Sequence, residues 1–112
     1  MAVAYRDLEI LAGNTVEFVV DVEGGPASLT GYVGSMAIRA QRADQAFLAA
    51  VAAEHITINA STRQVTVRIP GSVTATYTWR RGVYDLVITG PSGDPWCLVE
   101  GRVTSAPLVT RA

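Results

Sequence analysis

The segment from Trp79 to Thr104 constrains the fold more than any other part of the sequence, because it has the pattern of a single β-hairpin. Two apolar runs, 83–89 and 96–103, flank a connection rich in Gly, Pro, Ser and Asp, the residue types that form turns. Successive side chains of a strand point to opposite faces of the sheet. The pattern therefore predicts a long antiparallel strand pair with two distinct faces.

One face of this predicted hairpin carries apolar residues that we expect in the core. If the connection has an even number of residues, the side chains on that face are those of Tyr84, Leu86, Ile88, Cys97, Val99, Gly101 and Val103. The opposite face mixes charges with valines and large apolar residues, and it is too apolar for a plain solvated surface. We therefore predict a protein interface on this face, formed by Val87, Trp96, Leu98 and Arg102, with Trp79 at the start of the hairpin.

The register of the hairpin is open between two arrangements. In the first, Tyr84 lies opposite Gly101, so that its ring covers the gap beside the glycine. Asp85 then faces Glu100, which opposes two like charges. In the second, Tyr84 lies opposite Val103, and Asp85 faces Arg102 instead. A cross-strand pair contributes about 0.2–1 kcal/mol, so the like-charge pair alone does not exclude the first register.

Further alternating segments predict more strands, at 7–11, 15–22, 32–41, 56–58 and 64–69, of which the last two form a second hairpin. Their inward residues complete the expected core, which comprises Phe18, Met36, Ile38, Tyr84, Leu86, Ile88, Val99, Gly101 and Val103. The segment 44–54 is rich in Ala, which favours a helix, but its neighbours are strands. We prefer a strand or an irregular edge there.

Length and charge limit the classes of function. A chain of 112 residues fits one domain, residues 1–112, and its formal net charge of −1 gives no basic field for nucleic acid or an anionic membrane. Cys97 is the only cysteine, so no internal disulfide and no cysteine-built metal site is expected. The first residues lack the pattern of a signal peptide, and no apolar run is long enough to span a membrane. We expect synthesis in the cytoplasm.

No arrangement of residues predicts catalysis, a cofactor or a metal ion. His55 is the only histidine, and no serine lies in a nucleophile elbow. The carboxylates are spread singly along the chain. Trp79 and Trp96 are the residue type on which sugars stack, which leaves a carbohydrate-binding module as an alternative, although isolated tryptophans in β domains more often lie in a core or a protein interface.

Several short motifs follow one another over nearly the whole chain, at residues 13–15, 29–31, 36–39, 76–86, 98–103 and 109–111. Together they resemble a family of small virion proteins of tailed bacteriophages and prophages. The family is similar to the amino-terminal domains that anchor baseplate or receptor-binding components in siphophages. This chain departs from it in having Pro91 and Pro95 in the last hairpin connection, which stiffens that loop.

The resemblance implies a non-enzymatic structural protein of the virion. Together with the alternation, it predicts an immunoglobulin-like antiparallel β-sandwich of about seven strands. It implies a place in the tail, baseplate or receptor-binding apparatus, and the alternative is a capsid decoration, or cement, protein on the phage head. The expected partners are other virion proteins and further copies of the chain, with threefold symmetry. The terminal segments 1–6 and 106–112 are expected to dock on neighbouring subunits.

Overall fold

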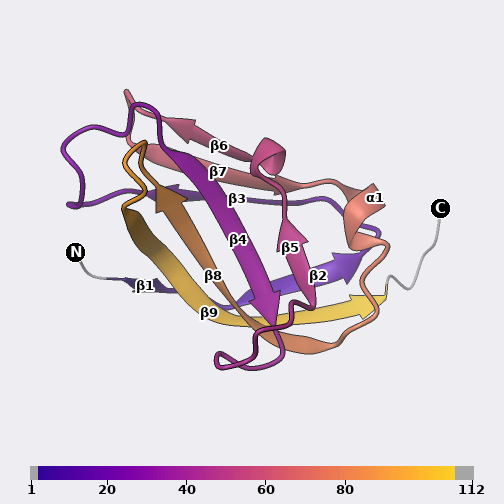
Figure 1. The fold of residues 1–112 in the computed structure, drawn as a ribbon. Coiled ribbons are helices and arrows are strands. Elements are labelled where there is room, and N and C mark those ends of the chain that lie inside the picture. Colours follow the sequence, from indigo (N-terminus) through magenta and orange to yellow (C-terminus); the bar gives the residue numbers. More distant parts are fainter. Residues whose placement is uncertain (1–2, 108–112) are drawn as a thin grey trace.

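The computed structural model describes residues 3–107, which form two β-sheets packed face to face (Figure 1). The strands are β1 (Ala4–Tyr5), β2 (Leu8–Ala12), β3 (Val16–Asp21), β4 (Val33–Arg39), β5 (Ala49–Val51), β6 (Ile56–Asn59), β7 (Gln64–Ile69), β8 (Arg81–Thr89) and β9 (Pro95–Pro107). The large sheet has the order β1-β9-β8-β4-β5, with β2 also beside β9, and the small sheet has the order β3-β7-β6. The predicted all-β sandwich is confirmed.

The described residues form nine strands rather than about seven antiparallel ones, and the differences lie at the edges of the large sheet. β1 and β2 both pair with β9 in parallel, one after the other along its length. Between them the chain stays attached to β9, because the Arg6 amide donates to the carbonyl oxygen of Glu100 and the Arg102 amide donates to Oδ1 of Asp7. One edge is thus divided into two short strands. Of the predicted docking segments at the termini, residues 1–2 and 108–112 lie outside the described residues.

The hairpin of β8 and β9 follows the first of the two registers over half of its length. Tyr84 pairs with Gly101 and Leu86 pairs with Val99, but beyond a β-bulge Val87 pairs with Cys97. The bulge places one extra residue, Leu98, in β9 between these pairs. As a result the face of every β9 residue on the turn side of the bulge changes relative to the prediction.

The core lies between the two sheets. Of the residues expected in it, Cys97 is not in the core, and the following nine are buried: Phe18, Met36, Ile38, Tyr84, Leu86, Ile88, Val99, Gly101 and Val103. In segment 44–54 the structure has the edge strand β5 and one turn of 3₁₀ helix, η1 (Ala53–His55), with irregular chain before them. This agrees with the strand or irregular edge that we expect there from the sequence.

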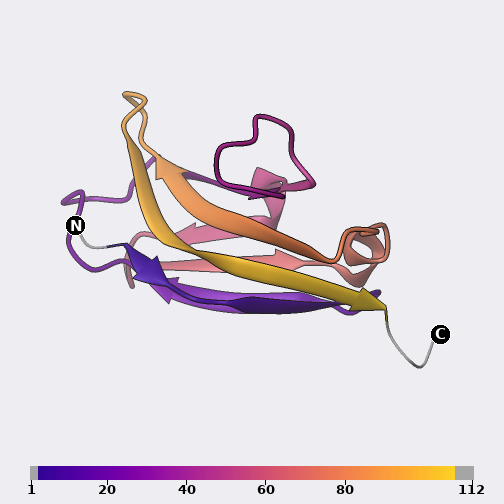
Figure 2. The same ribbon diagram turned by 90° about the horizontal axis from the view of Figure 1, so that it is seen from below.

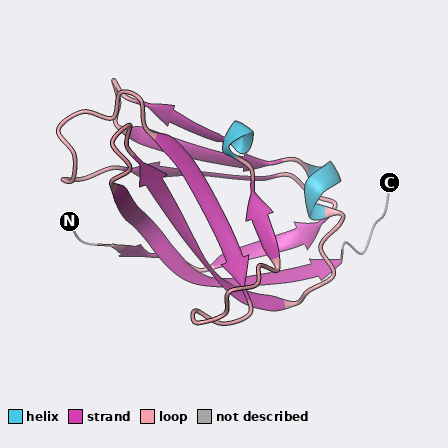
Figure 3. Ribbon diagram, in the orientation of Figure 1, coloured by secondary structure: helices cyan, strands magenta, loops and turns pink. Residues whose placement is uncertain are grey.

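The crossover between the sheets contains one turn of α-helix, α1 (Gly71–Thr74), shown in cyan with η1 in Figure 3. α1 packs against the turn between β2 and β3 through Thr74, whose side chain is fully buried. The Thr74 hydroxyl accepts a hydrogen bond from the Gly13 amide at 3.0 Å and donates one to the Asn14 carbonyl at 2.7 Å. In the described part of the chain, no helix is long and apolar enough to cross a membrane.

Replacing Thr74 with Val is expected to destabilise the domain by about 1–3 kcal/mol, because it removes the two part-buried hydrogen bonds to Gly13 and Asn14 while keeping the side-chain volume. The free energy of unfolding, measured by urea denaturation, tests this expectation. Thr78→Val is the control, since Thr78 lies in the same crossover and is exposed. Equal effects of the two substitutions would contradict the role assigned to the Thr74 hydroxyl.

Candidate interaction surface

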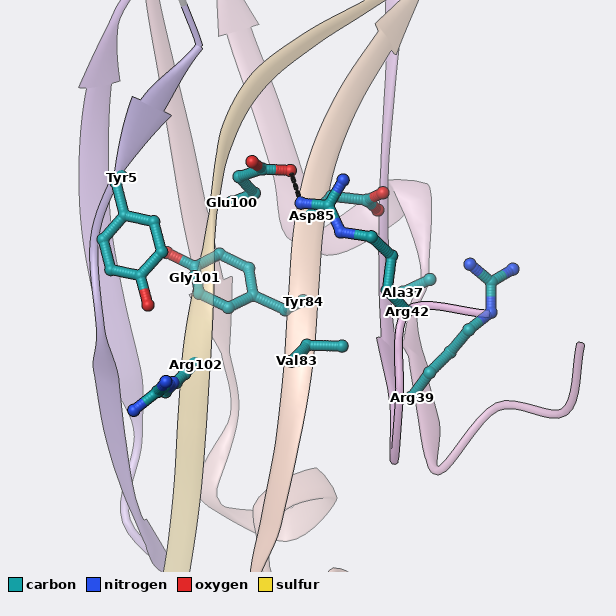
Figure 4. A pocket seen from close by; sticks show the side chains of 10 residues that line it. All are labelled: Tyr5, Ala37, Arg39, Arg42, Val83, Tyr84, Asp85, Glu100, Gly101 and Arg102. Atoms are coloured by element: carbon teal, nitrogen blue, oxygen red, sulfur yellow. Dashed lines mark hydrogen bonds and ion pairs between the residues drawn. The ribbon is translucent and has the colours of Figure 1, made fainter. Parts of the chain in front are cut away.

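The face of the large sheet that points away from the small sheet, here called the outer face, is organised in rows across the strands. Asp85 on β8 lies between Ala37 on β4 and Glu100 on β9, and Tyr5 on β1 continues this row beyond Glu100. The next row consists of Arg39, Val83 and Arg102. We call these the acidic row and the basic row. A shallow, open hollow of about 150 Å³ lies over both rows (Figure 4).

The acidic row contains two carboxylates on directly opposed positions, Asp85 and Glu100. Opposed like charges are unfavourable unless cations compensate them. Arg42, in the loop between β4 and β5, reaches across β8 and forms an ion pair with Glu100 (Figure 4). The Arg42 side chain is 78% exposed, so this pair adds little stability. Within the described residues, Asp85 has no ion-pair partner.

The basic row contains two guanidinium groups in different surroundings. The Arg39 guanidinium stacks on the ring of Phe47, 4.5 Å from its centroid, and the loop that carries Phe47 rises on the outer side of the large sheet (Figure 2). Arg102 is exposed and, among residues 3–107, forms no ion pair. Within residues 3–107, Arg39 forms no ion pair either, and the same holds for Arg81 and Glu9 at exposed positions of this face. The outer face therefore carries charged groups of both signs, among them Asp85 and Arg102, that form no ion pair in the described part of the monomer.

The floor of the hollow is formed by Tyr84 and Gly101, which pair across β8 and β9. The Tyr84 side chain crosses β9 at the glycine (Figure 4), and its hydroxyl donates a hydrogen bond of 2.6 Å to the carbonyl oxygen of Arg6. Burial raises the pKa of Tyr84 to about 12, so the hydroxyl keeps the proton that this bond requires. The bond fixes the chain between β1 and β2 against the large sheet.

Two of the five residues predicted to form an interface lie on the outer face. Val87 is half-buried there, between Ser35 and Cys97, and Arg102 is exposed. Cys97 was expected in the core, but the bulge turns it to the outer face. Burial, and then the nearby Asp85 and Glu100 carboxylates, raise the pKa of its thiol, so it stays protonated.

The prediction of Leu98 as an interface residue is wrong. Only 3% of Leu98 is exposed, because the bulge directs its side chain into the core beside that of Val99. A regular alternation along β9 predicts, for each residue on the turn side of the bulge, the face opposite to the one that it occupies.

Trp79 and Trp96 were also expected at the interface, and both are instead partly buried and packed against the core. The indole Nε1 atoms of both are buried without a hydrogen-bond partner. Trp96 pairs with Ile88 near one end of β8. Trp79 lies just before the other end of β8, and its ring is tilted against that of Tyr77, with the two ring centroids 5.2 Å apart. The two indoles therefore do not form a shared exposed platform of the kind that binds a carbohydrate.

Four residues of the hollow are not predicted from the sequence as part of a surface site: Tyr5, Ala37, Arg39 and Arg42. The alternation of segment 32–41 does place Ala37 and Arg39 outward on their strand. Tyr5 reaches the hollow only through the parallel pairing of β1 with β9, and Arg42 reaches it from an irregular loop. No local pattern indicates either position.

Neither a protein-family model nor a curated protein matches the sequence. Among solved structures, the crystal structure of a chicken TCR is similar in fold, with a TM-score of 0.53 and 13% sequence identity. The match covers 97% of this chain and 57% of that chain. At this identity the likeness concerns the fold alone, and it confirms the predicted immunoglobulin-like sandwich. No group of three or more His, Cys, Asp or Glu side chains suited to a metal ion occurs in residues 3–107.

Proposed function

We propose that this chain is a non-enzymatic structural protein of a bacteriophage virion, which assembles on the particle through the outer face of its large sheet. The observation that carries the proposal is the charge arrangement of that face. Asp85 and Arg102 form no ion pair within the described residues, and half-buried valines lie beside them. Charged groups of this kind, around an apolar surface, favour a protein partner that supplies the missing charges.

The outer face of the small sheet differs in this respect. There Glu17 and Arg68 lie opposite each other on β3 and β7, and Arg68 Nε is 3.2 Å from Glu17 Oε2. Asp21, on the same face, accepts a hydrogen bond from Nε2 of Gln64. Each of these charged groups therefore has a polar partner within the monomer. The comparison supports docking by the large sheet rather than by the small one.

The family resemblance supports the tail, baseplate or receptor-binding apparatus as the place of assembly, with other virion proteins and copies of this chain as partners. A capsid decoration protein is the second candidate. The two differ in the particle to which the purified protein would bind. Many weak contacts on a symmetric particle would add through multivalency in either case.

Purified protein mixed separately with isolated tails and with capsids that lack it, then imaged by electron microscopy, is expected to decorate tails. Val87→Asp is expected to weaken this binding by at least about tenfold, because it puts a desolvated charge into the contact. The fold should be kept, since Val87 is only half-buried.

Val19→Asp is the matched control, because Val19 is an exposed valine on β3 of the small sheet. It should bind particles as the unmodified protein does. Decoration of capsids alone would move the protein to the head, and binding to neither particle would overturn the virion role. Equal weakening by both variants would reject the outer face as the docking surface.

A further inference from the structure

We propose that residues 108–112 of one copy of this chain add as a strand to the free edge of β3 in another copy, so that copies join head to tail. The inference goes beyond the proposed function, because it concerns the edge of the sandwich between β1 and β3 rather than the outer face. It names the segment Leu-Val-Thr-Arg-Ala, residues 108–112, as the occupant of that edge.

The first reason is that β3 has an unpaired edge. β3 is the last strand of the small sheet, and only β7 pairs with it. The amide of Val22, one residue beyond β3, donates to the carbonyl oxygen of Arg63 at 2.8 Å. Along an antiparallel pair, residues that exchange hydrogen bonds alternate with residues that do not. The backbone groups that point away from β7 are therefore those of Glu17, Val19 and Asp21, and such a row is a template for a further strand.

The second reason is the groove beside this edge. It has a volume of about 410 Å³, and it is lined by residues of β1 and β9 from the large sheet and of β3 from the small sheet. It reaches Leu98 and Val99, which belong to the core, and it has the exposed apolar side chains of Tyr5 and Val19 at its rim. A strand added to β3 would direct alternate side chains into this groove and cover the apolar surface.

The third reason is the pattern of segment 108–112. In a strand, Val109 and Arg111 lie on one face, and Leu108, Thr110 and Ala112 lie on the other. A guanidinium without a partner is costly to bury, so the face with Arg111 has to point outward. The only orientation that satisfies this condition places Leu108 toward the groove, where an apolar side chain is needed.

The charges at the groove agree with this segment. Two carboxylates, on Asp21 and Glu23, and one guanidinium, on Arg6, line the groove, and none of them forms an ion pair within residues 3–107. The groove therefore has an excess of one negative charge. Arg111 is the only charged side chain of the segment, and it supplies the opposite charge.

The distance along β9 requires that the segment come from another copy. Val99 lies at the groove and pairs with Ala4, whereas β9 ends at Pro107, at the opposite end of the sandwich from β1 (Figures 1 and 2). The strand covers about 26 Å between Val99 and Pro107. Residues 108–112 span at most about 18 Å when fully extended, so they do not reach the groove of their own copy. A contact of this kind joins copies head to tail, in a ring or an open chain.

The test uses one variant that cannot accept the strand and one that cannot donate it, studied by sedimentation equilibrium. The unmodified protein is expected to associate increasingly with concentration. Val19→Pro removes the central amide of the free edge, and Leu108→Asp puts a carboxylate into the groove. Each variant alone should associate at least about tenfold more weakly. An equimolar mixture should form a dimer of one copy of each and nothing larger, because only one donor and one acceptor remain.

Val19→Thr and Leu11→Asp are the matched controls. The first replaces the same side chain and keeps the amide, and the second makes the leucine-to-aspartate change at an exposed position of β2. Both should associate as the unmodified protein does. Circular dichroism checks that every variant is folded, and Val19→Pro should be, since its amide does not bond to β7.

Amide hydrogen exchange of the unmodified protein tests the proposal without Val19→Pro. Exchange at Val19 should slow by at least about tenfold between dilute and concentrated solutions, and it should not slow in Leu108→Asp. Association that leaves the Val19 amide unchanged would overturn the proposal, because the contact would then lie elsewhere.

A monomer at all concentrations up to about 1 mM would also overturn the proposal, as would a mixture of the two variants that forms no dimer. Binding to tails is scored in the separate imaging experiment. A protein that decorates tails through Val87 but never associates in solution would therefore keep the proposed function and reject only this inference.

Discussion

Leu98→Asp is expected to unfold the domain. Leu98 is 3% exposed and lies among the core side chains of the large sheet. Truncation of a buried leucine alone costs about 2–5 kcal/mol, and a buried, unpaired carboxylate adds several more. Domains of this kind have about 5–15 kcal/mol of stability in total. Circular dichroism and thermal unfolding should show loss of the cooperative transition, or a transition shifted down by well over ten degrees.

Val87→Asp is the control for this substitution as well. Val87 lies next to the bulge, on the outer face, and pairs with Cys97. The same new charge should therefore lower the melting temperature by only a few degrees. If Leu98→Asp stayed folded and Val87→Asp unfolded, the faces of β9 on the turn side of the bulge would be the reverse of those described.

The sequence pattern predicts the faces of β8 correctly, but it does not predict the faces of β9 beyond the bulge. Tyr84, Leu86 and Ile88 alternate with polar or smaller residues on β8, and the alternation alone identifies them as core. On β9 the run from Trp96 to Val99 is apolar at every position. A continuous apolar run contains no alternation, so nothing in it reveals an extra residue or the resulting change of face.

The outer face was predictable where a single strand carried the signal. Val87 and Arg102 were found because each lies on a regular part of a strand, and the like-charge pair of Asp85 and Glu100 followed from one of the two registers considered. The hollow as a whole was not predictable. Tyr5 and Arg42 complete it from distant segments, and their positions depend on tertiary packing.

Tyr84 and Gly101 link this surface to the stability of the fold. The glycine leaves the space that lets the backbone at Arg6 lie against β9, and the Tyr84 hydroxyl binds that backbone. The pairing of Tyr84 with Gly101 was considered from the sequence as a ring that fills the gap left by the glycine. In the structure the gap is filled by the backbone of the edge segment, and the tyrosine holds that segment in place.

Gly101→Val is accordingly expected to destabilise the domain by at least about 3 kcal/mol, at the upper end of what overpacking costs. A Cβ atom at this position would collide with the carbonyl oxygen of Arg6, which is backbone and has no rotamer by which to move away. The substitution should therefore displace the segment from Tyr5 to Asp7 and break the Tyr84–Arg6 hydrogen bond. Urea denaturation measures the loss, and faster amide hydrogen exchange at Arg6 and Arg102 would locate it.

Two further variants separate the effect of the clash with the Arg6 backbone from that of the lost Tyr84–Arg6 hydrogen bond. Thr104→Val adds a valine at an exposed position of the same strand and should change stability by less than about 0.5 kcal/mol. Tyr84→Phe removes only the hydrogen bond to Arg6 and should cost about 0.5–1.5 kcal/mol. If Gly101→Val cost no more than Tyr84→Phe, the backbone of Arg6 would have room to move, and the tight contact at Gly101 would not be what holds β1 and β2 to the sheet.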